Sequence, residues 1–509
     1  MQVVAKDSLS ALKNGSDIRG IASSTSDLKV NLTPEAMKGI AQGLLFFIRQ
    51  TKESQYQAGD LVVGIGCDSR LSGPQLKAIL IDEWVDQGVS VIDFGLATTP
   101  AMFMSTQFPQ FRCDLAVMLT ASHLPYYYNG VKVFTQVGGV ESHDIQTILA
   151  HPEKLPGNHR IGASVSADLL GPYAQDLVNK IRQGTQLTEP YPLQGWKIVV
   201  DAGNGAGGFF AENVLRELGA DISGSQFLTP DGHFPNHIPN PDNQEAMASL
   251  LRAVEAHQAD LGVIFDTDVD RSAVVTKAGK LLNRNNLIAV LSQMILQEHP
   301  KTSIVTNSPT SEHLQTFIEA LGGHQVRYIS GYRNVINKAI ALNQAGTDCQ
   351  LAIETSGHAA FKENYFLDDG AYVIAKILML LPSLQKAGRT LDELISTLKQ
   401  PVETIEIRFK LEEINYRQLG ERVIAALAGI QEVGWQVDEN NHEGIRFKVR
   451  GNYGSGWFLL RLSLHEPLLV LQVENDVLGK NRLVLARIQK FLVNYPNVNQ
   501  EKLALALNH

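Results

Sequence analysis

The stretch DLAVMLTASHLPYYYNGVKVF, residues 114–134, determines how the rest of the chain is interpreted. Its apolar run 115–119 ends abruptly at small polar residues, which is typical of a buried strand that enters a loop. Ser122 and His123 follow this run, and ligands of open α/β sheets gather outside the carboxyl ends of strands. A serine beside a histidine is a candidate nucleophile or phosphate carrier. An isolated pair of this kind is more often a solvated loop.

The second half of the stretch contains turn-forming residues and a cation. We expect Pro125, Asn129 and Gly130 to shape a turn. Lys132 then returns a positive charge to the neighbourhood of Ser122. A nearby lysine strengthens the interpretation of Ser122 as a phosphate carrier.

The same unit, a short apolar strand followed by a polar or glycine-rich loop and a helical pattern, recurs along the chain. It occurs at 61–70, 114–123, 197–207, 261–271, 303–311 and 350–358. Alternating strands and helices predict an α/β fold with three βαβ-type, mixed-sheet domains. After Pro401, several strand patterns and helical patterns at 413–428 and 480–494 indicate a smaller C-terminal α+β domain with a largely antiparallel sheet.

The composition excludes several classes of protein. The chain has 509 residues and a net charge of -9, which argues against nonspecific nucleic-acid binding. Its three cysteines are widely spaced, so neither a disulfide framework nor a cysteine metal site is expected. No apolar run approaches the ~18 residues of a membrane span, and residues 1–10 lack a signal-peptide core. We expect a cytoplasmic protein with no membrane partner.

Asp266, Asp268 and Asp270 alternate directly after an apolar strand pattern. In an extended loop, alternate side chains point the same way, so the three carboxylates should converge and repel unless a cation joins them. Hard oxygen ligands favour Mg²⁺ or Ca²⁺. An EF-hand is excluded because Arg271 and Lys277 occupy the positions of its glycine and glutamate.

A glycine pattern at 203–208 competes with this interpretation. Gly203, Gly205 and Gly208 satisfy the dinucleotide pattern G-x-G-x-x-G. The acidic residue that such a site needs at the end of the next strand is missing, because Asp221 precedes that strand. We therefore favour a tight βα turn over a nucleotide site.

Further polar groups follow other strands. Glu354, Ser356 and His358 suit sugar hydroxyls. The loop RLSLHEP at 461–467 offers Arg461, Ser463 and His465 to an anion. Arg19 and Arg70 are further loop arginines. A guanidinium group suits phosphate because it can donate two hydrogen bonds to it at once. Together with the serine and the carboxylates, these groups predict phosphoryl transfer on a polyol, with charge offset by a cation and arginines.

These motifs resemble those of the α-D-phosphohexomutase superfamily, which includes phosphoglucomutase, phosphomannomutase and phosphoglucosamine mutase. Residues 120–132 resemble its phosphoserine loop T-A-S-H-N-P-x-x-x-N-G-x-K, and 266–271 resemble its metal loop D-G-D-G-D-R. Residues 353–358 resemble its sugar loop G-E-x-S-G-H, and 461–467 resemble its phosphate loop. The four motifs occur in the superfamily's order across nearly the whole chain.

The resemblance implies four domains around a central cleft, each contributing one loop. The spacing of the strand units and the linker stretches place these domains at 1–160 with the phosphoserine loop, 161–282 with the metal loop, 283–398 with the sugar-binding loop and 399–509 with the phosphate-binding loop. The resemblance also implies small-molecule hexose phosphates as partners and a monomer or weak dimer.

The resemblance further implies roles for individual residues. Ser122 would carry the phosphoryl group and, with Asp266, Asp268 and Asp270, hold Mg²⁺. Catalytic assistance would come from Lys132, Arg19, His358 and His123. Substrate binding would involve Arg271, Glu354, Ser356, Gly331, Arg333, Arg461, Ser463, His465 and Arg70. The reaction would interconvert hexose 1-phosphate and hexose 6-phosphate, of glucose or mannose, through a hexose 1,6-bisphosphate.

The chain departs from the superfamily pattern at seven loop positions. These are Leu124, Thr267, Val269, Ile353, Leu462, Leu464 and His465. Thr267 and Val269 replace both glycines of the metal loop, so its backbone should be stiffer. Because of these changes, a hexose 1,6-bisphosphate synthase that uses a sugar bisphosphate donor stays open as an alternative. A noncatalytic sugar-phosphate sensor with the same fold is a second alternative.

Overall fold

The computed structural model describes residues 9–158, 160–464 and 466–508. The chain forms two compact units. The first unit runs to Leu287 and includes Ser356–Glu393, and the second comprises Ile288–Thr355 and Leu394–His509. The division into four domains at the boundaries given above stays a prediction.

The first sheet of the first unit is mixed. Its strand order is β1-β2-β6-β5-β3-β4-β8, with β7 beside β6. The strands are β1 Lys13–Asn14, β2 Asp17–Ile21, β3 Val62–Cys67, β4 Ser90–Leu96, β5 Leu115–Leu119, β6 Tyr128–Thr135, β7 Gly138–Gly139 and β8 Ser164–Ser166. Strand β3 is parallel to β4 and β5, whereas β6 is antiparallel to β2 and β5.

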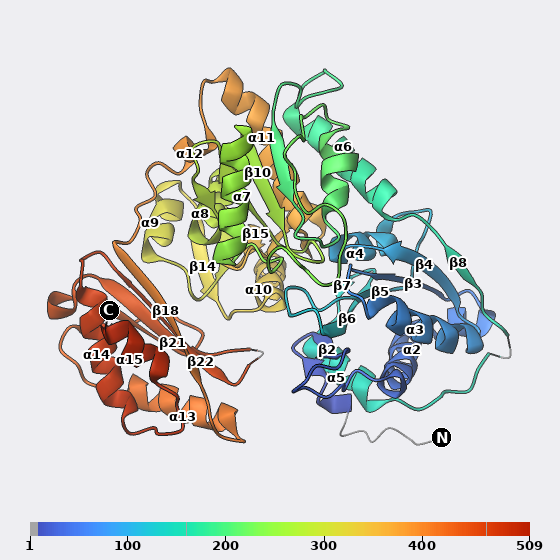
Figure 1. The fold of residues 1–509 in the computed structure, drawn as a ribbon, viewed down its shortest axis with the longest axis horizontal. Helices are drawn as coiled ribbons and strands as arrows, with labels where there is room; N and C mark the ends of the chain where they lie inside the picture. The colour runs from blue at the N-terminus through green and yellow to red at the C-terminus, as the bar shows by residue number, and fades with distance from the viewer. Residues whose placement is uncertain (1–8, 159, 465, 509) are drawn as a thin grey trace. The chain divides into compact units, whose positions relative to one another are not determined.

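Helices cover this sheet because their apolar faces need a partner. They are α2 Pro34–Ala58, α3 Gly73–Asp86, α4 Thr99–Gln107 and α5 Ser142–Ala150 (Figure 1). Local signals fix the ends of α2: the Thr33 hydroxyl accepts a hydrogen bond from the Ala36 N–H, and Gly59 ends the helix in the left-handed conformation. All of β5 is buried, as the apolar run predicted.

The second sheet of the first unit has the order β12-β11-β10-β9. Its strands are β9 Ile198–Asp201, β10 Leu261–Phe265, β11 Ser272–Thr276 and β12 Leu281–Leu282. Strands β9 and β10 are parallel, and β10 and β11 are antiparallel. Helices α6 Leu170–Thr185, α7 Gln244–His257 and α11 Gly370–Lys386, a π-helix Phe210–Leu215 and the short strands β16 Ala359–Phe361 and β17 Leu367–Asp368 complete the unit.

The second unit contains one parallel and one antiparallel arrangement. Strands β13 Ser303–Asn307, β14 His324–Tyr328 and β15 Cys349–Ile353 are parallel, with helices α9 Glu312–Ala320 and α10 Tyr332–Gln344 between them in the sequence. Helix α8 Arg284–Glu298 leads into this part, and α12 Leu391–Leu394 precedes the C-terminal part.

The C-terminal sheet is antiparallel throughout, in the order β18-β22-β21-β20-β19. Its strands are β18 Glu403–Lys410, β19 Trp435–Val437, β20 Ile445–Val449, β21 Gly456–Leu462 and β22 Leu468–Asn475. Helices α13 Tyr416–Ala428, α14 Lys480–Leu492 and α15 Glu501–Asn508 pack against it (Figure 1). The predicted fold class, mixed α/β sheets followed by an α+β domain, is confirmed.

The predicted turn at Asn129 and Gly130 is wrong, because both residues lie inside β6. Gly130 is required there by a close approach of neighbouring backbone. A Cβ on Gly130 would lie 2.2 Å from the Ile18 carbonyl oxygen on β2 and 2.8 Å from that of Thr120. The glycine therefore lets two strands and the serine loop come together.

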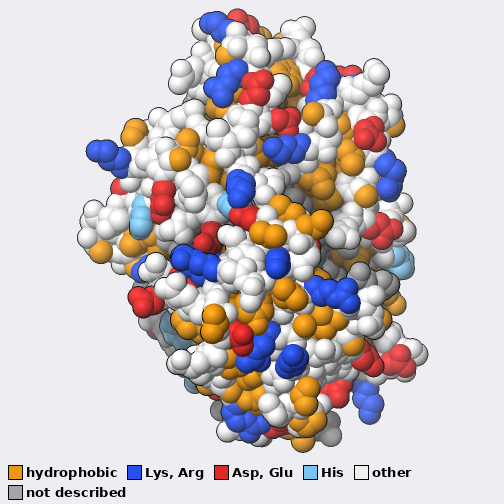
Figure 2. Space-filling view, turned by 90° about the vertical axis from the view of Figure 1, so that its left-hand side faces the viewer, with side chains coloured by type: hydrophobic (Ala, Val, Ile, Leu, Met, Phe, Trp, Pro, Cys, Tyr) orange, Lys and Arg blue, Asp and Glu red, His pale blue; other side chains and the backbone are white. Residues whose placement is uncertain are grey.

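Charged side chains are mixed on the surface that Figure 2 shows, where acidic and basic groups alternate among hydrophobic ones. Two of the arginines that matter below, Arg70 and Arg271, lie under the surface and are 1% and 2% exposed. Among the described residues, no helix is both long and apolar enough to cross a bilayer.

Candidate active site

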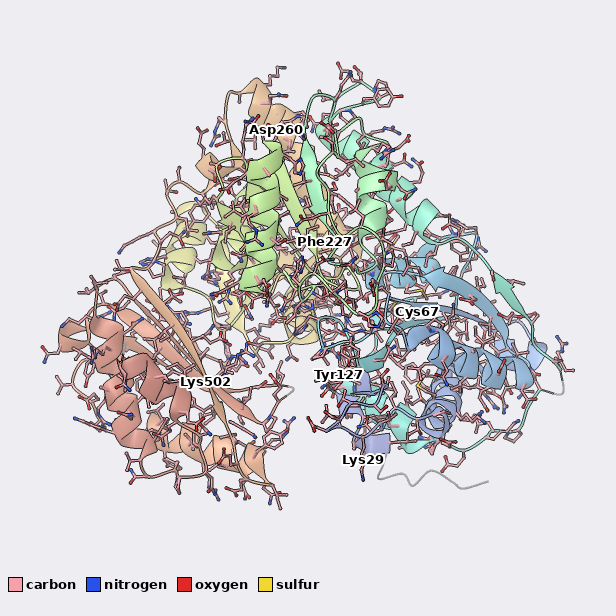
Figure 3. All side chains as sticks on the ribbon, in the orientation of Figure 1. Lys29, Cys67, Tyr127, Phe227, Asp260 and Lys502 are labelled. Atoms are coloured by element: carbon pink, nitrogen blue, oxygen red, sulfur yellow. The ribbon has the colours of Figure 1, made fainter. Side chains whose placement is uncertain are left out.

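The serine loop follows β5 in the first unit and holds Ser122 in a constrained position. Ser122 is 2% exposed, and its φ of 51° lies in the left-handed region that few non-glycine residues adopt. Its backbone N–H donates to the Thr120 hydroxyl at 2.9 Å. Tyr127, labelled in Figure 3, lies at the far end of the same loop. A residue held so firmly by its neighbours fits a site that is formed before substrate arrives.

Arg70 shapes this loop from the segment that follows the neighbouring strand β3, which ends at Cys67 (Figure 3). The guanidinium donates to the backbone carbonyl oxygens of Ser122, Leu124, Pro125 and Tyr128 at 2.5–3.0 Å, and to the Asp68 carboxylate at 3.2 Å. All three guanidinium nitrogens of Arg70 thus have protein partners. These contacts favour a role in shaping the loop over the direct substrate contact predicted for Arg70.

The three aspartates follow β10 in a tight turn, and their ligand atoms lie within 4.8 Å of one another. The predicted convergence is confirmed, but the predicted extended loop is wrong. Val269 has a φ of 66°, so the backbone reverses between Asp268 and Asp270. A β-branched residue is costly in this conformation. The turn is supported by the glycine segment after β9, where the Ala206 N–H donates to the Thr267 carbonyl oxygen at 2.8 Å.

Ser122 meets this turn directly. Its hydroxyl donates to the Asp266 carboxylate at 3.1 Å and accepts from the Arg271 guanidinium at 3.1 Å. Arg271 also donates to Asp266 at 2.9 Å. The structure therefore brings the serine, a carboxylate and a guanidinium into mutual contact, although Ser122 and Asp266 are far apart in the sequence.

Burial and neighbouring charges shift the acid–base behaviour of this cluster in opposite directions. Burial, reinforced by the charge of Asp270, raises the pKa of Asp266 well above its usual value. Burial would also raise the pKa of Asp270, but Lys132 and Arg271 outweigh it and lower that pKa. For Arg271, burial opposes the charged form, yet Asp266 and Asp270 raise its pKa above the usual value.

The donor set fits a hard divalent cation. Lys132 pairs with Asp270 through a short contact and lies 3.3 Å from the Asp268 carboxylate, whose other partner is the Thr99 hydroxyl at 2.5 Å. One oxygen of Asp268 and one of Asp270, both buried, have no hydrogen-bond partner among the described residues. Buried carboxylate oxygens without donors are costly, and oxygen-rich clusters of this kind are what Mg²⁺ and Ca²⁺ prefer.

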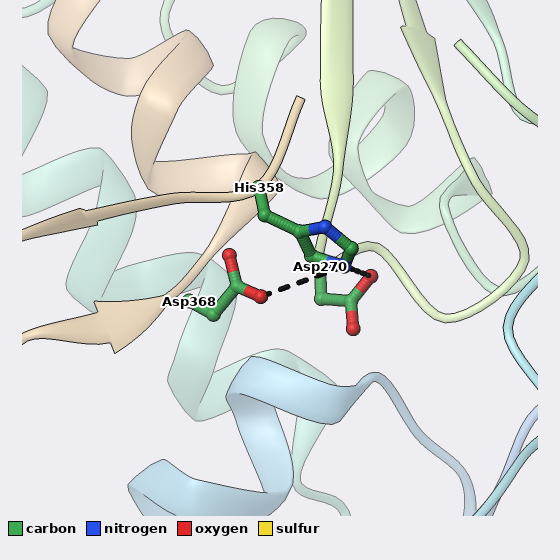
Figure 4. Close-up of side chains that lie close together, drawn as sticks. All are labelled: Asp270, His358 and Asp368. Atoms are coloured by element: carbon green, nitrogen blue, oxygen red, sulfur yellow. Dashed lines mark ion pairs between the residues drawn. The ribbon is translucent and has the colours of Figure 1, made fainter. Parts of the chain in front are cut away.

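Two histidines flank the cluster. His358 Nε2 lies 3.6 Å from a carboxylate oxygen of Asp270 and from one of Asp368 (dashed lines in Figure 4), and the Ser356 hydroxyl is 3.0 Å from its Nδ1. His123 Nδ1 is 3.4 Å from the Ser122 hydroxyl.

The pKa of each histidine is lowered well below the usual value. Burial is the largest cause, followed by the positive charge of Arg271. Near neutral pH both imidazoles are therefore uncharged and can accept a proton or a hydrogen bond.

The remaining predicted residues fall in two places. Arg19, in the first unit, forms an ion pair with Asp17 at 2.8 Å. In the second unit, the Glu354 carboxylate accepts a hydrogen bond from the Gly331 N–H at 2.7 Å, and Arg333 donates to Asn337 at 3.1 Å.

The predicted phosphate loop lies in the hairpin between β21 and β22. Arg461 is inside β21, so the loop is shorter than the sequence pattern suggested. The Ser463 hydroxyl accepts from the Glu466 N–H at 3.3 Å. His465 lies outside the described residues.

Sequence reasoning missed the acidic partners of the predicted cations. Asp17 pairs with Arg19, and Asp68 pairs with Arg70. In both cases the carboxylate stands two residues before the arginine, a D-x-R spacing that could have been noticed. Asp368 and Thr99 carried no such signal, because they reach the cluster only through the fold.

Comparison with known protein families agrees with this architecture. Three models described as phosphoglucomutase/phosphomannomutase alpha/beta/alpha domains I, II and III match residues 11–155, 172–279 and 283–401, respectively. Together they span the serine, aspartate and Glu354 motifs.

Individual relatives extend the similarity over nearly the whole chain. A phosphomannomutase/phosphoglucomutase of Pseudomonas aeruginosa is 31% identical over 461 residues, which cover 90% of each chain. A phosphoglucomutase of Neisseria gonorrhoeae is 29% identical, over 95% of this chain and 96% of its own. A crystal structure of a phosphoglucomutase/phosphomannomutase family protein from Burkholderia thailandensis superimposes with a TM-score of 0.78 at 26% identity, covering 96% of this chain and 98% of that one.

These similarities define the class of this protein as a sugar-phosphate mutase built from α/β domains. The chain belongs to the phosphoglucomutase/phosphomannomutase family. The family resemblance predicted from the sequence motifs is thereby confirmed, and membership implies an enzyme of the phosphotransferase and isomerase type.

Proposed function

We propose that this protein is a phosphohexomutase that interconverts the 1-phosphates and 6-phosphates of glucose, mannose or both. The observation that carries the proposal is the contact of the Ser122 hydroxyl with both Asp266 and Arg271, at 3.1 Å each. An acceptor carboxylate and a donor guanidinium on one buried oxygen suit a hydroxyl that alternates between free and phosphorylated forms.

Asp266, Asp268 and Asp270, with an oxygen of phosphorylated Ser122, would hold Mg²⁺. The two carboxylate oxygens without donors support this assignment. When bound, the cation supplies charge neutralisation at the phosphoryl group. Hexose 1,6-bisphosphate would serve as intermediate and activator.

The transfer step is a displacement at phosphorus. The bond between the Ser122 oxygen and phosphorus breaks as a bond forms from phosphorus to the free hydroxyl oxygen of a hexose monophosphate. The hydroxyl loses its proton in this step, and neutral His358 is the candidate to accept it. The Lys132 ammonium, with Arg19 and His123, would assist by stabilising the charge that develops. After the bisphosphate turns, its other phosphoryl group returns to Ser122.

Residues beyond the transfer centre are proposed to bind substrate. Glu354 and Ser356 suit sugar hydroxyls, and Gly331 and Arg333, at the start of α10, suit sugar selection. Arg461, Ser463 and His465 suit the phosphate that is not transferred, because a planar guanidinium pairs with two phosphate oxygens at once.

Intact-mass measurement followed by a hexose-phosphate panel tests the proposal. We expect an added mass of about 80 Da at Ser122, the mass of one phosphoryl group, and Mg²⁺-dependent interconversion that a trace of hexose 1,6-bisphosphate accelerates. Net accumulation of bisphosphate with negligible isomerisation would instead establish a bisphosphate synthase. Binding of hexose phosphates without any turnover would establish a sensor, and would refute the mutase proposal.

A further inference from the structure

Glu443 connects two predicted motifs of the second unit, although it belongs to neither. One oxygen of its carboxylate accepts hydrogen bonds from the Ser330 N–H at 3.2 Å and the Ser330 hydroxyl at 2.7 Å. The other oxygen lies 3.7 Å from the Arg461 guanidinium. Its side chain is 9% exposed, so solvent screens these interactions only weakly. A single carboxylate thus faces a phosphate-binding arginine on one side and a loop on the other.

The loop that Glu443 holds is in turn bonded to Glu354. Gly331 follows Ser330 directly, and its N–H donates to the Glu354 carboxylate at 2.7 Å. Gly331 has a φ of 113°, which only glycine adopts readily, and Asn334 fixes the preceding carbonyl through a 2.7 Å hydrogen bond. Movement of Ser330 would therefore displace the N–H that orients Glu354.

Arg461 keeps unused hydrogen-bonding capacity. Its Nε is buried and has no partner among the described residues. Within the described part of the chain, its Nη1 reaches only the Leu462 carbonyl oxygen, at 3.4 Å, besides the ion pair with Glu443. Glu443 consequently orients the guanidinium and leaves the donors that a phosphate would need.

The segment that carries Glu443 is itself firmly placed. Asp438, at its start, accepts from Arg327 at 2.8 Å and lies 3.3 Å from Arg446. At its end, Gly444 packs so closely that a Cβ would lie 2.2 Å from the Leu460 carbonyl oxygen. The carboxylate is therefore held by a fixed backbone, as a positioning role requires.

We propose that Glu443 is a positioning residue that determines specificity: it sets Arg461 for the substrate phosphate and, through Ser330 and Gly331, sets Glu354 for the sugar hydroxyls. This inference rests on the proposed function. It differs from a purely structural role because both the phosphate affinity and the choice of sugar should depend on this one carboxylate.

Steady-state kinetics of three variants with glucose 1-phosphate and mannose 1-phosphate test the inference. Glu443→Ala should raise KM about tenfold, the loss of one charge-assisted contact, and change the ratio of kcat/KM between the two sugars at least about threefold. Glu443→Gln retains an acceptor for Ser330, so it should raise KM and keep the sugar ratio close to that of the wild type. Arg461→Ala should raise KM for both sugars equally.

Glu439→Ala provides the matched control, because Glu439 is exposed on the same loop; it should match the wild type. Calorimetric titration with inorganic phosphate measures the Arg461 site without turnover, and Glu443→Gln should weaken this binding. If Glu443→Ala folds poorly, Glu443→Gln and Ser330→Ala carry the test. Normal wild-type turnover with unchanged KM and sugar ratio in these variants refutes the inference alone. Absence of wild-type turnover refutes the proposed function and the inference with it.

Discussion

Arg70 and Arg461, one in each unit, show two opposite ways of using a guanidinium. Arg70 is 1% exposed, and its donors are engaged by backbone carbonyls and Asp68. Arg461 is 17% exposed at its side chain and has a buried Nε without a partner among the described residues. The first arginine supports the backbone of a loop, and the second is proposed to bind a phosphate. The region around Ser122 is thus preorganised, whereas Arg461 keeps a guanidinium nitrogen without a hydrogen-bond partner among the described residues.

Removing the proposed carrier is expected to have the largest effect. Ser122→Ala should lower kcat by about 10⁴-fold or more, because the covalent route is lost. The variant should keep its circular dichroism spectrum and lack the phosphoryl mass. Ser164→Ala, on an exposed strand, is the control and should be unaffected. Turnover of Ser122→Ala at the wild-type rate would eliminate the carrier role.

Weakening the carboxylate cluster should have the next largest effect. Asp268→Asn should lower kcat about 10²- to 10³-fold at fixed Mg²⁺, because one anionic ligand is removed. Activity should vanish on treatment with a chelator and return on addition of Mg²⁺, with a higher Mg²⁺ requirement in the variant. A Mg²⁺ titration that is identical for the variant and the wild type would contradict the assigned metal ligands.

Removing Arg70 should act mainly on stability. Arg70→Met removes the buried cation that pairs with Asp68 and the donor of four loop carbonyls, so the free energy of unfolding should fall by about 3–5 kcal/mol. Arg216→Met, which breaks an exposed ion pair, should change it by less than about 0.5 kcal/mol.

The loss should also depend on pH. Burial raises the pKa of Asp68 from 3.8 to about 6 even with Arg70 present. Because the pKa of Asp68 is higher in the folded protein than in the unfolded chain, the free energy of unfolding falls as the pH rises from the unfolded pKa to the folded pKa. Without Arg70 the folded pKa is higher still, so this fall continues to higher pH. Thermal unfolding of Arg70→Met should therefore show a larger deficit against the wild type at pH 8 than at pH 5. An equal deficit at both pH values would exclude Asp68 as the cause.

Altering Arg461 should have the smallest effect, and it should change substrate binding without changing stability. Arg461→Lys retains the charge but loses the planar fork, so KM should rise about tenfold while kcat changes little. The melting temperature should stay within about 1 °C of the wild type, because few protein contacts are lost. Arg450→Lys, exposed in the same unit, should have no effect. A large loss of stability in Arg461→Lys would contradict the claim that Arg461, unlike Arg70, contributes to binding and not to stability.

The sequence was informative where local chemistry decides the structure. The run 115–119 is apolar without interruption and was correctly placed in a buried strand, and the spacing of Asp266, Asp268 and Asp270 correctly indicated a carboxylate cluster. The residue roles derived from the resemblance stay predictions until the variants are measured.

Conformations and contacts that depend on segments far away in the sequence could not be predicted in the same way. Gly130 suggested a turn, but its role is to admit the Ile18 carbonyl of another strand. The residue type of Val269 gave no sign of its left-handed φ, because β-branched residues avoid that region; the signal was the glycine that the superfamily pattern has at this position. Glu443 stands far from Ser330 in the sequence, and only the fold brings them together.

The grip of Arg70 on the serine loop bears on how that loop can evolve. Every loop atom it binds is a main-chain oxygen, including the Leu124 carbonyl at 2.6 Å. Any amino acid supplies such an oxygen, so replacing the superfamily's asparagine by leucine at this site leaves the scaffold of the loop intact. The side chains of the loop can thus change during evolution, while an arginine far away in the sequence keeps the loop backbone in the same shape.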